Sequence, residues 1–266
     1  MIESSEDDLI FKDIFFSYNS HVNKKIICNN LSLTMKSNNF TSIIGPSGSG
    51  KTSLLKLAAG LLKPISGQIN FKNTALSEIV NNITLVQQNV ALMPWLTVFE
   101  NIAFGLQNNK KNSKELILRT INKVGLKDCE NLFPHELSGG MSQRVAIARA
   151  LIFKPKLFLL DEPFGALDNL SREIIAHELV AIIKKELSTV VMVTHSIEEA
   201  ALLSDEVLIV GSNPLYLIKR CIPPKTACSK TWQDLGLRKS LEIKIFQNYL
   251  KLIREKSYET LEKKDN

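Results

Sequence analysis

A glycine-rich loop between an apolar strand and a helix is the feature that most constrains this chain. The loop follows the pattern G-x-x-x-x-G-K-[ST], and its residues are Gly45, Pro46, Ser47, Gly48, Ser49, Gly50, Lys51 and Thr52. The residues before it, Phe40-Thr41-Ser42-Ile43-Ile44, predict a buried strand, and a helix is expected from about Gly50 to Leu61. Strand, loop and helix in this order are the context that a phosphate-binding loop requires.

The backbone N–H groups of such a loop and the positive end of the following helix both favour a triphosphate. Gly48 would let the backbone approach phosphate oxygens, Lys51 would neutralise the β and γ phosphates, and the Thr52 hydroxyl would ligate Mg²⁺. Ser53 belongs to the same predicted nucleotide-binding group. An ordinary glycine-rich turn is the alternative, and the flanking strand and helix argue against it.

Two adjacent carboxylates end a second apolar run, Leu157-Phe158-Leu159-Leu160. Asp161 is placed to hold Mg²⁺ through water, and Glu162, one residue further, can polarise an attacking water. Two carboxylates at an apolar strand end need cations or substrate to offset desolvation. A solvated strand end is the alternative, which the phosphate loop in the same chain makes less favourable.

A third string, Leu137-Ser138-Gly139-Gly140-Met141-Ser142-Gln143-Arg144, lies upstream of the carboxylates. A Ser hydroxyl and glycine N–H groups before a helix can form a second anion site, and a simple helix cap is the alternative. The three strings in this order resemble the nucleotide-binding subunit of an ATP-binding cassette (ABC) transporter, from about Leu9 to about Val210. The resemblance implies that Ser138, Gly139 and Gly140 cap the γ-phosphate of an ATP held by the other subunit of a head-to-tail homodimer.

The same resemblance assigns roles to isolated residues. Gln88 matches the glutamine that contacts Mg²⁺ and water, although Gln87 stands where the family usually has Phe and leaves two glutamines open. Asp168 lies in the loop that crosses the dimer interface, and His195 matches the switch histidine that bonds the γ-phosphate. Tyr18 matches the aromatic residue that stacks on adenine, with an ordinary strand tyrosine as the alternative.

The expected fold is α/β: a P-loop (RecA-like) core with an amino-terminal antiparallel β subdomain and an inserted helical subdomain. The expected strands are 9–18, 31–35, 40–44, 157–160, 189–193 and a last one at 207–210. The expected helices are 50–61, 98–106, 113–124, one after Gly140, and 170–187. The last helix lies between the strands at 157–160 and 189–193, so these two strands are expected to be parallel and joined by a right-handed crossover. We expect a nucleotide-binding domain over 1–215 with a helical insertion at about 89–155. A C-terminal extension over 216–266 is expected to end in a helix.

Composition excludes several function classes. The net charge is +6, but the 33 Lys and Arg residues are spread without a basic stripe broken by aromatics, which favours a solvated surface over nucleic-acid binding. The first eight residues lack the pattern of a signal peptide, and every apolar run is shorter than a membrane span needs, so a cytoplasmic chain is expected. The four cysteines form no C-x-x-C pair, so reduced structural thiols are expected rather than zinc ligands.

Two strings resemble importers in particular: Phe133-Pro134-His135-Glu136 and Ser196-Ile197-Glu198-Glu199-Ala200. Residues 92–98, 163–168 and 241–254 resemble the group that imports nitrate, sulfonate, taurine and thiamine precursors. This resemblance implies an ATP-hydrolysing motor on the inner face of the cell membrane. Its partners would be an integral-membrane permease and a separate solute-binding protein. As the transported solute, sulfonate or nitrate is ranked ahead of a pyrimidine precursor.

The competing class is a soluble ABC ATPase that acts on nucleic acid or ribosomes. Such proteins usually carry two cassettes, or large coiled-coil or zinc insertions, which this sequence lacks. A nucleotide kinase or GTPase would not explain the Leu-Ser-Gly-Gly string. The apolar cluster Met93-Pro94-Trp95-Leu96 is a predicted docking surface for a short permease helix, and burial inside the helical subdomain is the alternative.

Overall fold

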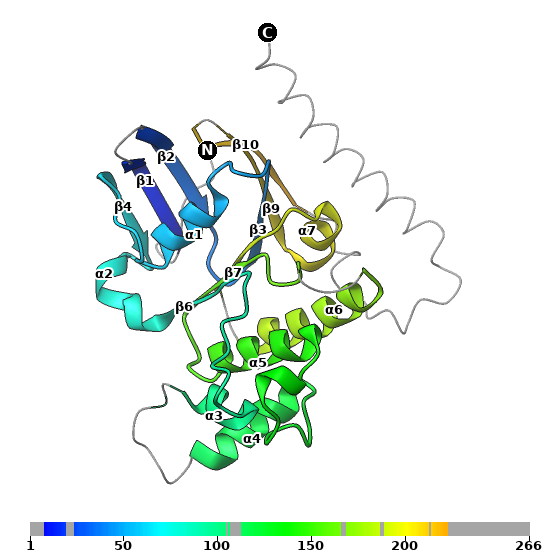
Figure 1. The fold of residues 1–266 in the computed structure, drawn as a ribbon. Coiled ribbons are helices and arrows are strands. Elements are labelled where there is room, and N and C mark those ends of the chain that lie inside the picture. Colours follow the sequence, from blue (N-terminus) through cyan, green and yellow to red (C-terminus); the bar gives the residue numbers. More distant parts are fainter. Residues whose placement is uncertain are drawn as a thin grey trace. The chain divides into compact units, whose positions relative to one another are not determined.

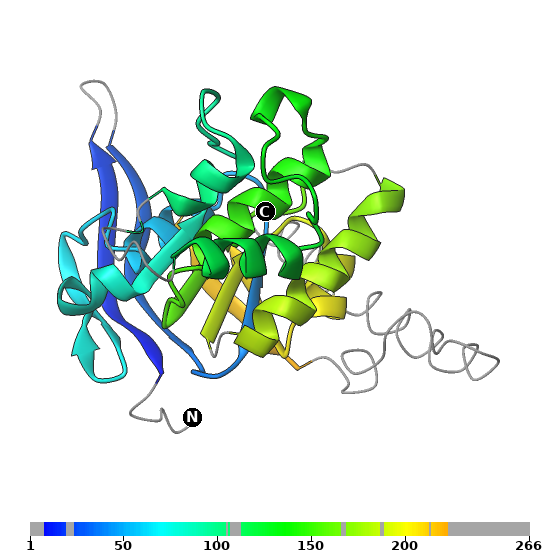
Figure 2. The ribbon, with the colours of Figure 1, turned by 90° about the horizontal axis from the view of Figure 1, so that it is seen from below.

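The computed structural model describes residues 8–19, 24–104, 106, 113–165, 169–186, 189–212 and 214–222. The chain divides into two compact units. Unit 1 comprises residues 1–80 and 189–266, and unit 2 comprises residues 81–188, so unit 2 is an insertion in the sequence of unit 1. Figures 1 and 2 show the elements of both units.

An antiparallel sheet forms the amino-terminal part of unit 1. Its strand order is β2-β1-β4-β5, with bounds β1 (Leu9–Asn19), β2 (Lys24–Met35), β4 (Ser66–Phe71) and β5 (Thr74–Ala75). Leu9 lies opposite Met35 on one side and Phe71 on the other, and all three side chains are buried. Such cross-strand apolar contacts stabilise a sheet, and the predicted antiparallel β subdomain is confirmed.

A second set of strands in unit 1 includes the strand that leads into the phosphate loop. Strand β3 (Phe40–Ile44) pairs in parallel with both β8 (Thr189–Val193) and β9 (Glu206–Gly211), and every residue of the three strands is buried. Strands buried on both faces are mainly apolar in sequence, which is why these three were predictable. The expectation that the strand ending at Val210 is the last one is wrong, because β10 (Tyr216–Cys221) pairs antiparallel with β9. Most of β10 is only partly buried, so it lacks the continuous apolar run of its neighbours.

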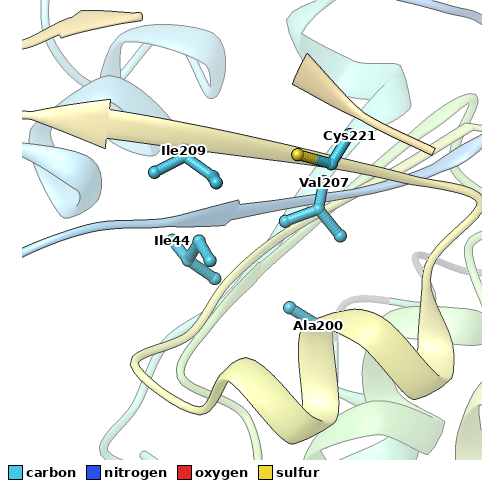
Figure 3. Close-up of a cluster of buried hydrophobic side chains, with 5 residues drawn as sticks. All are labelled: Ile44, Ala200, Val207, Ile209 and Cys221. Carbon is cyan, nitrogen blue, oxygen red and sulfur yellow. The ribbon is translucent and has the colours of Figure 1, made fainter. Parts of the chain in front are cut away.

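Unit 1 also contains α1 (Lys51–Ala58), α2 (Leu76–Ile79) and α7 (Ile197–Leu203). A 3₁₀ helix, Val80–Asn82, follows α2 at the boundary of the units. Helix α7 packs on the parallel strands through Ala200, which points toward Ile44 and Val207 in Figure 3. Ile209 and Cys221 complete this buried cluster. It therefore joins α7 to the strand that enters the phosphate loop.

Unit 2 contains a parallel strand pair and a group of helices. The strands are β6 (Ile83–Val86) and β7 (Leu157–Asp161). The helices are α3 (Val98–Ala103), α4 (Ser113–Lys123), α5 (Gly139–Leu151) and α6 (Asn169–Glu186), with a 3₁₀ helix at Pro134–Glu136. Arg144 on α5 donates to the Val124 carbonyl oxygen after α4 (2.8 Å) and to Glu178 on α6 (2.7 Å), which ties the three segments together. The helices expected at 98–106, 113–124, after Gly140 and at 170–187 are present, within a few residues at each end.

Candidate functional site

The phosphate loop has the backbone conformation that its glycines predict. Gly48 (φ 73°) and Gly50 (φ 102°) both lie in the left-handed region, which residues with a Cβ rarely adopt. A Cβ at Gly50 would also lie 2.6 Å from Cγ2 of Ile27, whereas no atom of the described residues lies within 4 Å of a Cβ at Gly48. Gly50 is therefore required by packing as well as conformation. Gly48 leaves open space beside the backbone, into which a phosphate can fit.

Lys51 and Ser49 provide the polar groups of this loop. Lys51 is buried at the start of α1, and its Nζ donates to the carbonyl oxygens of Gly45 and Pro46 at 2.8 Å each. The Ser49 hydroxyl is buried and has no hydrogen-bond partner among the residues that the structure describes. A buried polar group without a partner costs about 1–3 kcal/mol. An anion bound in the loop would supply the missing acceptor, so the loop fits a triphosphate.

Tyr18 lies next to the helix that follows the phosphate loop. Its hydroxyl is 3.2 Å from Oγ of Ser53, and its ring contacts Phe16 edge to face with centroids 5.0 Å apart. The residue is 40% exposed, so one part of the ring is held while another is accessible. This position is compatible with contact to a nucleotide, and stacking on adenine stays a prediction.

His195 also belongs to unit 1 and follows β8. Thr194, the residue before it, donates its backbone N–H to the Ile43 carbonyl oxygen on β3 at 3.3 Å. Strand β3 leads directly into the phosphate loop. The backbone next to His195 is therefore hydrogen-bonded to the strand that carries this loop. Sequence reasoning missed a network of Thr194, Ser196 and Glu199 around this histidine. A polar residue at the start of α7 was its only sequence signal.

The predicted carboxylates of unit 2 lie where β7 ends. Asp161 is the last residue of this strand and is buried, and Glu162 follows with φ 46°, an unusual conformation for a residue with a side chain. Gln88 Nε2 donates to Glu162 Oε2 at 2.9 Å. Gln87 instead lines a pocket elsewhere in the unit. Of the two glutamines, Gln88 is thus the one beside the predicted hydrolytic carboxylate.

Ser138 is the N-cap of α5. Its Oγ accepts from the Met141 N–H at 3.2 Å, and the residue is exposed. A hydroxyl that accepts one hydrogen bond still has its own hydrogen to donate. The cap and a second anion site are therefore compatible, with Gly139 and Gly140 forming the first turn of α5. Asp168 and the predicted C-terminal helix lie outside the described residues.

A pocket of about 450 Å³ lies in unit 2 beside the Met93–Leu96 turn. Gln87, Met93, Phe104, Arg149 and Phe153 are among its lining residues. Arg149 Nη1 donates to the Ala91 carbonyl oxygen at 2.9 Å, and burial lowers the pKa of its guanidinium.

Trp95 in the same turn is 72% exposed, and Leu96 is partly buried. Burial inside the helical unit, the alternative for this cluster, is therefore wrong for Trp95.

Two negative findings concern the part of the chain that the structure describes. There, no group of three or more His, Cys, Asp or Glu side chains is arranged to hold a metal ion. None of the helices in that part of the chain is both long and apolar enough to cross a membrane. Cys28 and Cys129 are free thiols.

A phosphate loop at the end of a parallel strand, with an antiparallel sheet in the same unit, defines a P-loop nucleotide-binding domain. The chain belongs to the ABC transporter family, because the sequence model of that family matches residues 28–165. The predicted family and fold class are thereby confirmed.

Relatives of known name support the finer grouping. The chain is 44% identical over 194 residues to the nitrate import ATP-binding protein NrtC of Synechococcus elongatus, a match that covers 71% of this chain and 29% of that protein. It is 42% identical over 193 residues to the taurine import ATP-binding protein TauB of Yersinia pestis, covering 71% and 76%. The chain thus spans less than a third of the nitrate protein and about three quarters of the taurine protein. Both belong to the group that the sequence resembles.

Solved structures agree with this assignment. A bacterial ABC transporter cassette solved as a dimer aligns with a TM-score of 0.72 and 30% sequence identity. The alignment covers 81% of this chain and 99% of that cassette. A post-hydrolysis state of the same cassette, bound to ADP and Pi, aligns with a TM-score of 0.70.

Proposed function

We propose that this chain is the ATP-hydrolysing motor subunit of an ABC importer that takes up a small solute through a separate permease. The observation that carries the proposal is the phosphate loop. It has open space beside Gly48, a fixed Lys51, and at Ser49 a buried hydroxyl that has no hydrogen-bond partner in the described part of the chain. Relatives named for nitrate, taurine and aliphatic sulfonate import support the importer class. The solute is one of these compounds or a thiamine-precursor-like compound.

The chemistry follows from the residues at the two sites. Lys51 binds the β and γ phosphates, and Glu162 accepts a proton from the attacking water. Glu162 has its carboxylate held by Gln88, so the orientation of that oxygen is fixed before substrate binds. Thr52, Gln88 and, through water, Asp161 would hold a Mg²⁺ ion, which would neutralise part of the phosphate charge. His195 bonds the γ-phosphate.

A second copy of the chain completes each site in this proposal. The free hydrogen of Ser138 Oγ and the N–H groups of Gly139 and Gly140 would bind the γ-phosphate on the other copy, with Asp168 in the crossing loop. The N-cap geometry of Ser138 and a related cassette solved as a dimer both support this arrangement. Nucleic acid has no part in it.

The permease partner is proposed to dock on unit 2, which places the chain at the cytoplasmic face of the membrane. Trp95 is the exposed anchor, and the pocket lined by Met93, Phe104 and Phe153 receives a short apolar helix of the permease. Phe104 and Phe153 are 53% and 44% exposed, so the rim of the pocket is itself apolar. A separate solute-binding protein selects the solute outside the cell.

Two substitutions with matched controls test the ATPase assignment. Lys51→Ala should abolish ATP binding and hydrolysis, whereas Lys56→Ala in the same helix should retain both. Glu162→Gln should retain ATP binding but lose hydrolysis by orders of magnitude, and the exposed Glu115→Gln should not. Binding is measured with a fluorescent ATP analogue and hydrolysis by phosphate release. Unchanged turnover in Lys51→Ala would refute the assignment.

Ser138→Arg tests the composite site separately. The monomer should still bind ATP, because Ser138 contributes to the nucleotide of the other copy, while cooperative hydrolysis should fail. Glu162→Gln should form a dimer on gel filtration with ATP. Loss of ATP binding by the Ser138→Arg monomer would instead assign this serine to the pocket of its own chain.

A further inference from the structure

Three hydrogen bonds join Thr194, Ser196 and Glu199 at the junction of β8 and α7, next to His195. The Ser196 N–H donates to Thr194 Oγ1 at 3.0 Å, and Thr194 Oγ1 donates to Glu199 Oε2 at 2.7 Å. The Glu199 N–H in turn donates to Ser196 Oγ at 3.1 Å. We call Thr194, Ser196 and Glu199, joined by these three bonds, the relay. His195 lies between Thr194 and Ser196 in the sequence, so both of its neighbours belong to the relay.

The direction of each bond follows from the chemistry of the groups. An ionised carboxylate only accepts, and a backbone N–H only donates, so the Thr194 hydroxyl must accept from Ser196 and donate to Glu199. Hydrogen bonds to a charged group are shorter and stronger than neutral ones, in agreement with the 2.7 Å distance. Thr194 is 1% exposed. Water therefore has little access to its hydroxyl, and the carboxylate of Glu199 is what completes the relay.

Both ends of the relay are fixed to β3. The Thr194 N–H donates to the Ile43 carbonyl oxygen, and Ala200, which follows Glu199, packs on Ile44 in the cluster of Figure 3. Ile44 is followed directly by Gly45, the first residue of the phosphate loop. One strand thus supports both the phosphate loop and the segment that carries His195.

We propose that Glu199, acting through the Thr194 hydroxyl, is a positioning residue that holds His195 for its contact with the γ-phosphate. The inference rests on the proposed role of His195 in hydrolysis. His195 itself is exposed, so the backbone on either side of it determines where its side chain begins. Glu199 binds no nucleotide atom and affects turnover only through the histidine.

A purely structural role for the relay, as a cap of α7, makes a different prediction. Loss of a cap would lower stability, and its effect would add to that of any change at His195. Loss of a positioning contact would lower turnover only while the histidine is present. Double-mutant cycles separate the two cases, because residues that act as one unit are not additive.

The experiment uses the full chain with Mg²⁺ and ATP and measures kcat, KM and the midpoint of thermal unfolding. Glu199→Ala and Thr194→Val remove the relay, while Glu199→Gln and Thr194→Ser keep an acceptor or a hydroxyl at the same place. Each is made alone and together with His195→Ala. Hydrogen exchange of the Ser196 amide reports on the relay even in variants with low activity.

We expect Glu199→Ala and Thr194→Val each to lower kcat about tenfold, the equivalent of one lost hydrogen bond, with KM changed less than twofold. The two conservative variants should recover most of kcat. In the His195→Ala background, neither relay change should lower kcat further. The proposal is overturned if the decreases of kcat caused by a relay change and by His195→Ala multiply in the double variant. It is also overturned if kcat stays unchanged while the Ser196 amide exchanges faster. Full activity of His195→Ala alone would instead refute the role proposed for the histidine.

Discussion

Asn101 on α3 shapes the turn that carries the exposed Trp95. This side chain is fully buried, and its Nδ2 donates to the carbonyl oxygens of Met93, Leu96 and Thr97 at 3.2, 2.9 and 3.0 Å. Its Oδ1 accepts from the Met93 N–H at 2.9 Å. One amide group thus serves four backbone groups of a turn outside regular secondary structure. Substitution of Asn101 should therefore destabilise unit 2 and loosen this turn.

The cost of Asn101→Ala can be worked out group by group. The carbonyl oxygens of Met93 and Thr97 retain bonds from the N–H groups of Leu96 (3.1 Å) and Asn101 (2.8 Å). The Met93 N–H and the Leu96 carbonyl oxygen lose the bonds that the structure gives them. At about 1 kcal/mol for each of these partly buried groups, plus the small cavity, the free energy of unfolding should fall by about 2–3 kcal/mol.

Asn101→Asp is the informative companion variant. It keeps the Oδ1 acceptor for the Met93 N–H, but it turns a carboxylate oxygen toward three carbonyl oxygens in a buried site. An unpaired buried charge costs more than a small cavity, so this variant should be less stable than Asn101→Ala at neutral pH. Protonation relieves the repulsion, and the gap between the two should therefore narrow as the pH falls.

Urea unfolding followed by circular dichroism measures these free energies. The chain has two tryptophans, Trp95 and Trp232. In a Trp232→Phe background the fluorescence anisotropy of Trp95 reports on the turn alone, and it should fall in both variants. A loss below about 0.5 kcal/mol for Asn101→Ala, or greater stability for Asn101→Asp at neutral pH, would refute the reasoning.

Three further predictions concern other residues. Gln88→Ala should lower ATP hydrolysis about tenfold or more because it removes the hydrogen bond that orients Glu162 Oε2. In the same phosphate-release assay, Gln87→Ala should leave hydrolysis by the isolated chain unchanged. Trp95→Asp should fold and bind ATP but fail to co-purify with the permease, and a lowered thermal midpoint would count against an exposed anchor. Burial raises the pKa of Cys28 to about 11 from an ordinary 9.0, so iodoacetamide should not modify it in the native chain at pH 8. Stability should fall between about pH 9 and 11, where only the unfolded thiol ionises, and Cys28→Ala should remove that fall, as pH-dependent urea midpoints would show.

Among the parallel strands, those that the sequence predicted are the ones whose burial is complete. Strands β7 and β8 carry apolar runs because both faces are covered, and this signal is local. Strand β3 is buried as fully, and Phe40, Ile43 and Ile44 supply its apolar signal. By contrast, the first three residues of β4 are exposed, and three of the four residues of β6 are only partly buried. These segments are strands because β1 and β7 offer them hydrogen-bonding partners. A partner distant in the sequence leaves no periodic pattern, so neither strand was predictable.

The candidate site shows the same division between local and non-local information. The conformation of the glycine-rich loop was predictable because its glycines and its flanking strand and helix are adjacent in the sequence. The choice between Gln87 and Gln88 was not, because two adjacent residues of the same type carry no sequence signal that tells which one faces the carboxylate. Only the position of Glu162, 74 residues away, distinguishes them, and Gln88 is the one that donates to it.

His195 and Trp95 raise a common physical problem, because an exposed side chain cannot be held in place by its own burial. Each lies in a short segment between regular elements, where backbone groups need partners other than those of a helix or sheet. In both segments a buried polar side chain supplies them: Thr194 beside His195, and Asn101 beneath Trp95. The spacings of these pairs match neither helix nor strand periodicity, so a sequence pattern does not reveal them. A search for buried polar side chains that bond to the backbone of exposed turns would therefore find positioning residues that a motif search overlooks.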